Sequence, residues 1–296
     1  RARKPVRIWI PVWVRVPARI RIPARIRIPA RVRNRFRRRS DGGAGLVAGS
    51  RGSGAGSSAP FEPDDCLGCG RNLRHPLRSP AAGLCIDCYM RIPWIAAPAC
   101  VRCGRNELCP DCRRRPSRYF RFSRSAVAYT PLMKEWLSAY KFRGNERWAD
   151  PLAHMLQHGY RLLLDRMRET GAGRPHAIAY VPLSEVRLRE RGFNQAEQLA
   201  RRLGRAVGLP VLGLLERSRH SDRQSWKARR ERVAGLRDAY RLSEAGRRMK
   251  ICGTAAGQPR IVLVDDVYTT GTTLDECARV LAGELGAEVF GLTWGR

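Results

Sequence analysis

The sequence predicts an α/β protein, with a mostly parallel sheet and flanking helices, that follows a small cysteine-rich module. The first observation is an apolar, β-branched run at 261–264, typical of a buried parallel strand, directly before the helical spacing of 274–285. The second is another apolar run, 177–183, which also precedes a helical stretch. The third is a set of four CxxC pairs between residues 66 and 112. A chain of 296 residues has room for one ordinary domain and a smaller one.

Residues 1–60 form an arm and a linker of low complexity. The first forty residues hold fifteen Arg and Lys and no acid, and proline recurs at every sixth position from Pro5 to Pro29. Such an arm could bind nucleic acid, with Trp9 and Trp13 stacking on bases. We favour a disordered low-complexity segment or the product of a misplaced start site, because a short DNA repeat encodes such regular hexads. Residues 40–60, rich in Gly, Ser and Ala, are expected to be a flexible linker.

Residues 61–118 predict a double zinc ribbon. A CxxC turn places two thiolates at the separation needed to share a tetrahedral zinc, and two turns complete a four-cysteine site. Sequential pairing of the turns is the simplest arrangement, and a crossed one stays open. Both zincs would be structural, and the small module would depend on them to fold. The expected ligands are Cys66, Cys69, Cys85, Cys88, Cys100, Cys103, Cys109 and Cys112.

Cysteine usage and hydropathy also indicate where the protein works. Ten cysteines that fall mostly in CxxC pairs favour metal binding in a reducing cytosol over a disulfide framework. The sequence contains no run of eighteen apolar residues and no signal-peptide core, so we expect a cytoplasmic protein without a transmembrane segment. The formal net charge of +31 leaves about +16 on residues 41–296, which favours polyanionic partners.

Residues 119–296 are expected to form the α/β domain. Two amphipathic helices between 126 and 164 flank a basic turn with Lys141, which either reaches a bound anion or is simply solvated. Residues 217–240, polar and basic, could be a mobile hood over a site, or a surface helix followed by a strand. A final buried strand is expected at 287–294.

A second cluster of basic residues follows the 177–183 strand. The connection to the next helix is expected to be a loop, with Asn194 or a neighbouring residue as the helix N-cap and Glu197 as its capping-box partner. Guanidinium groups there could bind phosphate in a bidentate manner, or they could form a solvated charge run. The arginines of this loop are Arg187, Arg189 and Arg191.

The stretch 261–273 carries the clearest chemistry in the chain. Two acids, Asp265 and Asp266, follow the strand at once, and a loop of hydroxyl residues around one glycine leads into a helix. Backbone N–H groups of such a turn point at an anion, which Gly271 allows to approach closely. The acids suit the 2′- and 3′-hydroxyls of a ribose, directly or through Mg²⁺, while the loop holds a phosphate. The expected phosphate-binding residues are Thr269, Thr270, Gly271, Thr272 and Thr273.

The stretch IVLVDDVYTTGTT resembles the phosphoribosyl-pyrophosphate (PRPP) motif of type I phosphoribosyltransferases. Residues 61–296 as a whole resemble the ComF family of competence-associated proteins, through the four CxxC pairs, YKFRGN at 140–145 and RGFNQ at 191–195. The resemblance implies a type I phosphoribosyltransferase fold over 119–296, PRPP and Mg²⁺ as ligands, and an association with uptake of single-stranded DNA. Thr269 stands where purine-salvage relatives usually carry a carboxylate, which disfavours a purine acceptor.

Two functional hypotheses follow. The first is a glycosyltransferase of the phosphoribosyltransferase type with an unknown acceptor, in which the three arginines face pyrophosphate and stabilise its departure. The second is a non-catalytic adaptor that retains the PRPP fold and handles single-stranded DNA beside the uptake machinery.

Overall fold

The computed structural model describes residues 65–73, 79–107, 109–114, 117–142, 145–218, 239–252 and 257–296. All of them belong to one compact unit, Ala59–Arg296. The expected arm and linker, Arg143 and Gly144 of the basic turn, and residues 219–238 of the expected hood lie outside the described residues.

A five-stranded sheet forms the centre of the molecule, and every neighbouring pair of its strands is parallel. The strand order is β1-β7-β6-β2-β3. The fold class and the three expected strands are confirmed, and the sequence had indicated neither β1 nor the two-residue β3. The strands are β1 (Phe120–Val127), β2 (Ala177–Tyr180), β3 (Val211–Leu212), β6 (Arg260–Val267) and β7 (Glu288–Gly295).

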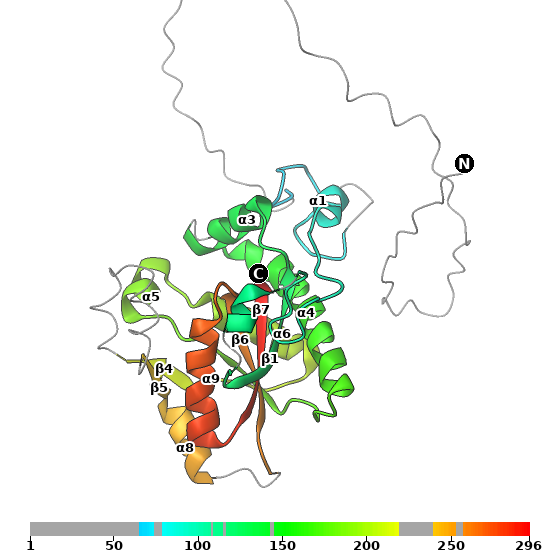
Figure 1. Ribbon diagram of the computed structural model, residues 1–296. Coiled ribbons are helices and arrows are strands. Elements are labelled where there is room, and N and C mark those ends of the chain that lie inside the picture. The colour runs from blue at the N-terminus through cyan, green and yellow to red at the C-terminus, as the bar shows by residue number, and fades with distance from the viewer. Residues whose placement is uncertain are drawn as a thin grey trace, which may run out of the picture. The chain divides into compact units, whose positions relative to one another are not determined.

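Helices cover both faces of the sheet (Figure 1). One face packs against α4 (Ala149–Glu169) and α6 (Gln195–Val207), with α3 (Pro131–Phe142) in the same core and the short η2 (Glu146–Trp148) beside it. The other face packs against α9 (Thr272–Leu285). Beside α9 lie α8 (Glu244–Cys252) and a two-stranded antiparallel ribbon of β4 (Leu215–Arg217) and β5 (Tyr240–Leu242).

The alternation of side chains along β6 explains why all four residues of its central part, 261–264, are apolar. Val262 and Val264 join the core on the α4 and α6 face, whereas Ile261 and Leu263 join the core beneath α9. Successive residues of a strand point to opposite faces, so a strand covered on both sides needs an apolar residue at every position. Asp265 is the first residue to depart from this pattern, and it marks the end of the buried part of the strand.

The connection after β2 differs from the expected loop. Residues Glu185–Arg191 form a short helix, α5, because the Ser184 hydroxyl accepts a hydrogen bond from the Arg187 N–H and Gly192 ends the helix with a φ of 76°. Asn194 caps α6 as expected, since its Oδ1 accepts from the N–H groups of Ala196 and Glu197. The Glu197 carboxylate instead pairs with Arg201, one turn further along α6.

The cysteine-rich module lies against β1, the edge strand of the sheet. Its two short helices are α1 (Ile86–Met90) and α2 (Pro110–Arg114). The chain between them pairs with β1: Ile95 N–H donates to the Ala126 carbonyl (3.0 Å), and Ser123 N–H donates to the Arg102 carbonyl (2.6 Å). The module therefore covers backbone groups that an edge strand would otherwise leave open to intermolecular pairing. The division of the chain at residue 118 remains a prediction.

Within the described part of the chain, none of the helices combines the length and the apolar character needed to cross a bilayer.

Candidate functional site

The carboxyl ends of β2 and β6 are neighbours, and the chain leaves them toward opposite faces of the sheet. After β2 the chain passes through α5 to α6 on one face, whereas β6 leads into α9 on the other. Ligands of open parallel sheets bind outside the strand ends at such a switch in direction. The sequence-predicted acids and phosphate loop follow β6, and the sequence-predicted arginines follow β2.

The acidic pair meets a lysine from the other side of the site. Lys141, near the end of α3, places its Nζ 2.6 Å from Oδ2 of Asp266, and the two side chains are only 16% and 18% exposed. The fold thus joins two predicted site residues that are far apart in sequence. Lys141 thereby balances the charge of Asp266.

Asp265 is held in a less favourable environment. Burial, and then the neighbouring Asp266 carboxylate, raise the pKa of the Asp265 carboxyl to about 7 from its usual 3.8. The Asp266 N–H donates to Asp265 Oδ1 (2.8 Å), which opposes this shift in part. A cation or a pair of hydroxyl donors at this position would favour the ionised form. The geometry therefore suits a ligand that supplies positive charge or hydroxyl groups.

The loop between β6 and α9 leaves backbone donors without acceptors. Thr269, Thr270, Gly271 and Thr273 have N–H groups that find no acceptor among the described residues. Gly271 sits at the helix N-cap with a φ of 74°, and a Cβ there would collide with the Tyr268 side chain. Consecutive free N–H groups in front of a helix form an anion-binding concavity, which the helix dipole strengthens.

The buried side chain of Arg118 holds this loop in place. Its Nη2 donates to the Thr270 carbonyl (3.3 Å), its Nη1 lies 3.7 Å from Oδ2 of Asp275, and its side chain is 4% exposed. The Tyr119 N–H also donates to Asp275 Oδ1 (2.8 Å). The segment that joins the cysteine module to β1 therefore anchors the loop and the first turn of α9 together.

The three predicted arginines of α5 occupy different environments. Arg191 lies over the Phe142 ring (4.9 Å) and donates to Gln195 Oε1 (2.9 Å). Burial and the charge of Arg187 lower the pKa of Arg191, whereas the charge of Asp266 opposes this, so Arg187 and Arg191 both act in the electrostatic field of the site. Arg189 is 77% exposed and lies 3.8 Å from Glu185.

The eight paired cysteines form two separate clusters, and the sequential pairing is the one observed. In each cluster the four Sγ atoms lie within 4.8 Å of one another. Cys69 Sγ and Cys85 Sγ are 3.7 Å apart, close to the separation of about 3.8 Å that a tetrahedron with Zn–S bonds of about 2.3 Å requires. Each cluster can hold one zinc. The first comprises Cys66, Cys69, Cys85 and Cys88, and the second comprises Cys100, Cys103, Cys109 and Cys112.

The two clusters pack on opposite faces of the sheet. Cys66, Cys85 and Cys88 belong to the core that contains α3 and α4, whereas Cys103, Cys109 and Cys112 belong to the core that contains α9 and Tyr268. Only the second cluster therefore shares its core with the phosphate loop.

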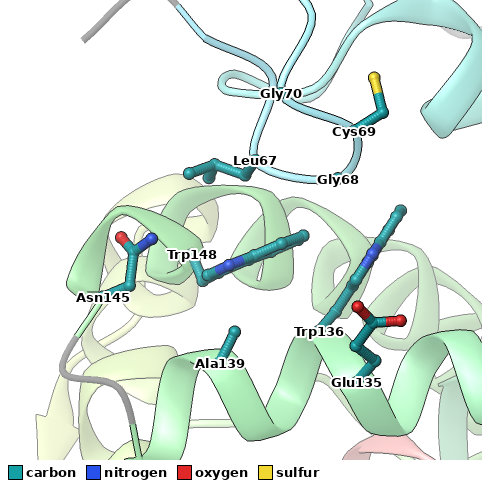
Figure 2. Close-up of a pocket in the computed structure, with 9 residues that line it drawn as sticks. All are labelled: Leu67, Gly68, Cys69, Gly70, Glu135, Trp136, Ala139, Asn145 and Trp148. Atoms are coloured by element: carbon teal, nitrogen blue, oxygen red, sulfur yellow. The ribbon is translucent and has the colours of Figure 1, made fainter. Parts of the chain in front are cut away.

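A cavity of about 340 Å³ lies beside the first cluster. Figure 2 shows the turn Leu67–Gly70 on one side of the cavity and the rings of Trp136 and Trp148 on the other. The two rings are 4.9 Å apart, and both residues are 2% exposed. The lining of this cavity includes no residue of the acidic pair or the phosphate loop. The cavity therefore belongs to the junction between the cysteine-rich module and the sheet domain.

Sequence reasoning missed three residues that shape the loop: Arg118, Tyr268 and Arg296. Arg118 stands in a basic run that gives no sign of burial, and Arg296 lies beyond the last apolar residue of β7. Tyr268 lies inside the recognised motif, yet hydropathy alone does not tell whether its ring faces a ligand or the core. It is buried, at 4% exposure.

The parallel sheet flanked by helices and the two four-cysteine clusters define an α/β protein with a cysteine-rich module that fits a double zinc ribbon. No protein-family model matches the chain. It is 32% identical to competence protein ComFC of Bacillus subtilis over 214 residues. This alignment covers 69% of this chain and 80% of that protein. It is 30% identical over 237 residues to competence protein F of Haemophilus influenzae, covering 78% and 95%. It is also 29% identical over 221 residues to the DNA utilization protein YhgH of Escherichia coli, covering 67% and 90%. The chain belongs to the ComF family.

Proposed function

We propose that this protein acts in DNA uptake and binds PRPP with Mg²⁺ at the carboxyl ends of β2 and β6. The observation that carries the proposal is the acidic pair, Asp265 and Asp266, directly before a loop in which four backbone N–H groups find no acceptor among the described residues. The relatives named competence proteins, at about 30% identity over most of the chain, support the link to DNA uptake. The grouping of eight cysteines in two metal-type clusters favours the reducing cytoplasm as its location.

Each part of PRPP has a proposed partner. The loop N–H groups and hydroxyls of Thr269–Thr273 hold the 5′-phosphate, and Asp265 and Asp266 hold the ribose diol, directly or through Mg²⁺. Arg187, Arg191 and, after release from Asp266, Lys141 face the pyrophosphate. Arg189 would have to leave Glu185 to take part. These cations would stabilise charge as pyrophosphate leaves the ribosyl carbon, so turnover to an acceptor is part of the hypothesis.

Calorimetry with PRPP and Mg²⁺ tests the binding site. We expect binding by the wild type and a large loss of affinity in the Asp265→Asn/Asp266→Asn double variant. Asp165→Asn is a matched control, because this carboxylate on α4 is 59% exposed and pairs with the neighbouring Arg168. Unchanged PRPP affinity in the double variant would contradict the assignment.

A non-catalytic adaptor that handles single-stranded DNA is the second candidate. The formal charge of about +16 on residues 41–296 and the name of the YhgH relative, a DNA utilization protein, favour it. We expect binding of a single-stranded oligonucleotide to weaken steeply with salt. Retention of this binding after deletion of residues 1–60 would place it in the folded unit, and total loss would place it in the arm. Release of pyrophosphate from PRPP in the presence of an acceptor would separate an enzyme from an adaptor.

A further inference from the structure

Arg296 connects the second four-cysteine cluster to the phosphate loop. Its Nη2 donates to Cys109 Sγ (3.3 Å), and its guanidinium carbon lies 4.0 Å from the centre of the Tyr268 ring. The backbone of Arg296 is fixed on both sides, since its N–H donates to the Val127 carbonyl (3.0 Å) and its carbonyl accepts from Tyr129 (2.7 Å). The contact with the cluster is therefore held by the sheet and does not depend on a flexible tail.

The chemistry of the cluster explains this guanidinium. Four thiolates around one zinc ion carry a net charge of −2, and a buried site of this kind is stabilised by charged N–H donors to sulfur. Nε and Nη1 of Arg296 are buried and have no hydrogen-bond partner within the described part of the chain. A cation with unused donors thus lies beside Cys109 of the second cluster. Arg71, the arginine near the first cluster, is 63% exposed and forms an ion pair with Asp87 (2.5 Å).

Tyr268 carries the contact to the loop. Its ring is packed perpendicular to Phe120 (89°, centres 6.3 Å apart) and beneath Gly271, where a Cβ would meet the Tyr268 hydroxyl. The Tyr268 N–H donates to the Gly295 carbonyl (2.9 Å). A displacement of the ring is therefore expected to displace Gly271 and Thr270, whose N–H groups find no acceptor among the described residues. Arg118 restrains the same loop at Thr270.

We propose that Arg296 and Tyr268 couple the second four-cysteine centre to the phosphate loop, so that zinc there and PRPP each strengthen the binding of the other. This inference rests on the proposed function. Coupling between two sites is reciprocal, so the effect can be measured from either ligand. The first centre lies in the other core, and its zinc should not respond to PRPP. Arg296 and Tyr268 act as positioning residues, because neither is proposed to touch PRPP.

The experiment measures the rate at which a chromogenic chelator removes zinc from the intact protein. We expect two phases in the wild type, one per centre, and saturating PRPP with Mg²⁺ should slow one phase about fivefold or more. Mg²⁺ with pyrophosphate alone serves as the control for chelation by the ligand itself. In Arg296→Met the slowed phase should lose its dependence on PRPP, and its rate without ligand should rise. Arg71→Met is the matched control and should leave the response intact.

Tyr268 variants separate coupling from simple loss of a centre. Tyr268→Phe keeps the stacking ring, so PRPP should still slow the release of zinc from this variant. Tyr268→Leu should retain two zincs, but PRPP should no longer slow their release. If the wild type binds PRPP and neither phase responds, the coupling is refuted and the proposed function stands. If the wild type fails to bind PRPP in calorimetry, both the coupling and the proposed function are refuted. Equal zinc release from Arg296→Met and wild type without ligand would also overturn the role of Arg296.

Discussion

Replacing Asp265 by Asn should stabilise the protein, and increasingly so as the pH rises. The Asn side chain is isosteric with the protonated carboxyl, and its Oδ1 can still accept the Asp266 N–H bond. It removes a charge that burial and the Asp266 carboxylate disfavour, since together they raise the pKa of Asp265 to about 7. A functional carboxylate held in this way costs stability, which a neutral residue recovers.

The magnitude follows from the two pKa values. A folded-state pKa above the unfolded value means that stability is fully present below pH 3.8 and is lost as the pH rises to about 7. A full shift corresponds to about 4 kcal/mol at about 1.36 kcal/mol per pKa unit. Between pH 5.5 and 8.5 about 2 kcal/mol of this remains to be lost, and partial solvation of the pair reduces it to about 1–2 kcal/mol. The Asn variant has no ionisable group at this position, so its stability does not fall in this way.

Thermal unfolding followed by circular dichroism, with zinc present, measures the difference. The pH is kept above about 5.5, because thiolates release zinc when they are protonated. The melting temperature of Asp265→Asn relative to wild type should rise by about 2–8 °C between pH 5.5 and 8.5, at about 2–4 °C per kcal/mol. Asp165→Asn, at an exposed carboxylate, should show no such trend. An offset for Asp265→Asn that stays constant with pH, or falls, would refute the reasoning.

Three further predictions concern the metal, the loop and a helix cap. Fully reduced protein should contain two zincs per chain by elemental analysis, and one or none would contradict the two-cluster arrangement. Gly271→Ala should weaken PRPP binding at least tenfold in calorimetry, because its φ of 74° and the collision with Tyr268 displace the loop. The control Gly283→Ala, in α9 with open space around its Cα, should bind normally and gain about 0.5–1 kcal/mol of stability. Asn194→Ala should lower the free energy of unfolding by about 1–2 kcal/mol in urea titration, since two N–H groups of α6 lose their acceptor.

The elements with a regular apolar pattern could be predicted from the sequence, and those without one could not. β6, β2 and β7 are covered on both faces, and most of their residues are apolar. β1 was not predicted because Ser123, Arg124 and Ser125 interrupt its apolar pattern, although all three residues are buried. The polar groups of Arg124 and Ser125 find partners that only the fold provides: Ser125 Oγ bonds to Thr293 Oγ1 (2.7 Å), and Arg124 donates to the Val101 carbonyl (3.2 Å).

The candidate site shows the same division between local and long-range information. The acids and the glycine of the loop lie within seven residues, so their spacing alone indicates an anion site. The ion pair of Lys141 with Asp266 and the bond of Arg118 to Thr270 join residues over a hundred positions apart, which no local pattern encodes. The contact of Arg189 with Glu185 depends on α5, a short helix that its end caps stabilise and that the hydropathy pattern does not reveal.

The cysteine-rich module and the sheet also depend on each other more closely than the spacing of the cysteines implies. From the sequence, residues 61–118 would unfold alone when zinc is removed, because so short a segment has little core of its own. In the structure, a Cβ on Gly104 would lie 2.8 Å from the Ser123 carbonyl, and one on Gly68 would lie 3.0 Å from Trp136. Both zinc turns are thus in close contact with the body, one on each face of the sheet, while the chain between them covers the edge of β1. Zinc binding that orders these turns therefore also closes both cores and protects the sheet edge, which joins the stability of the candidate site to its metal centres.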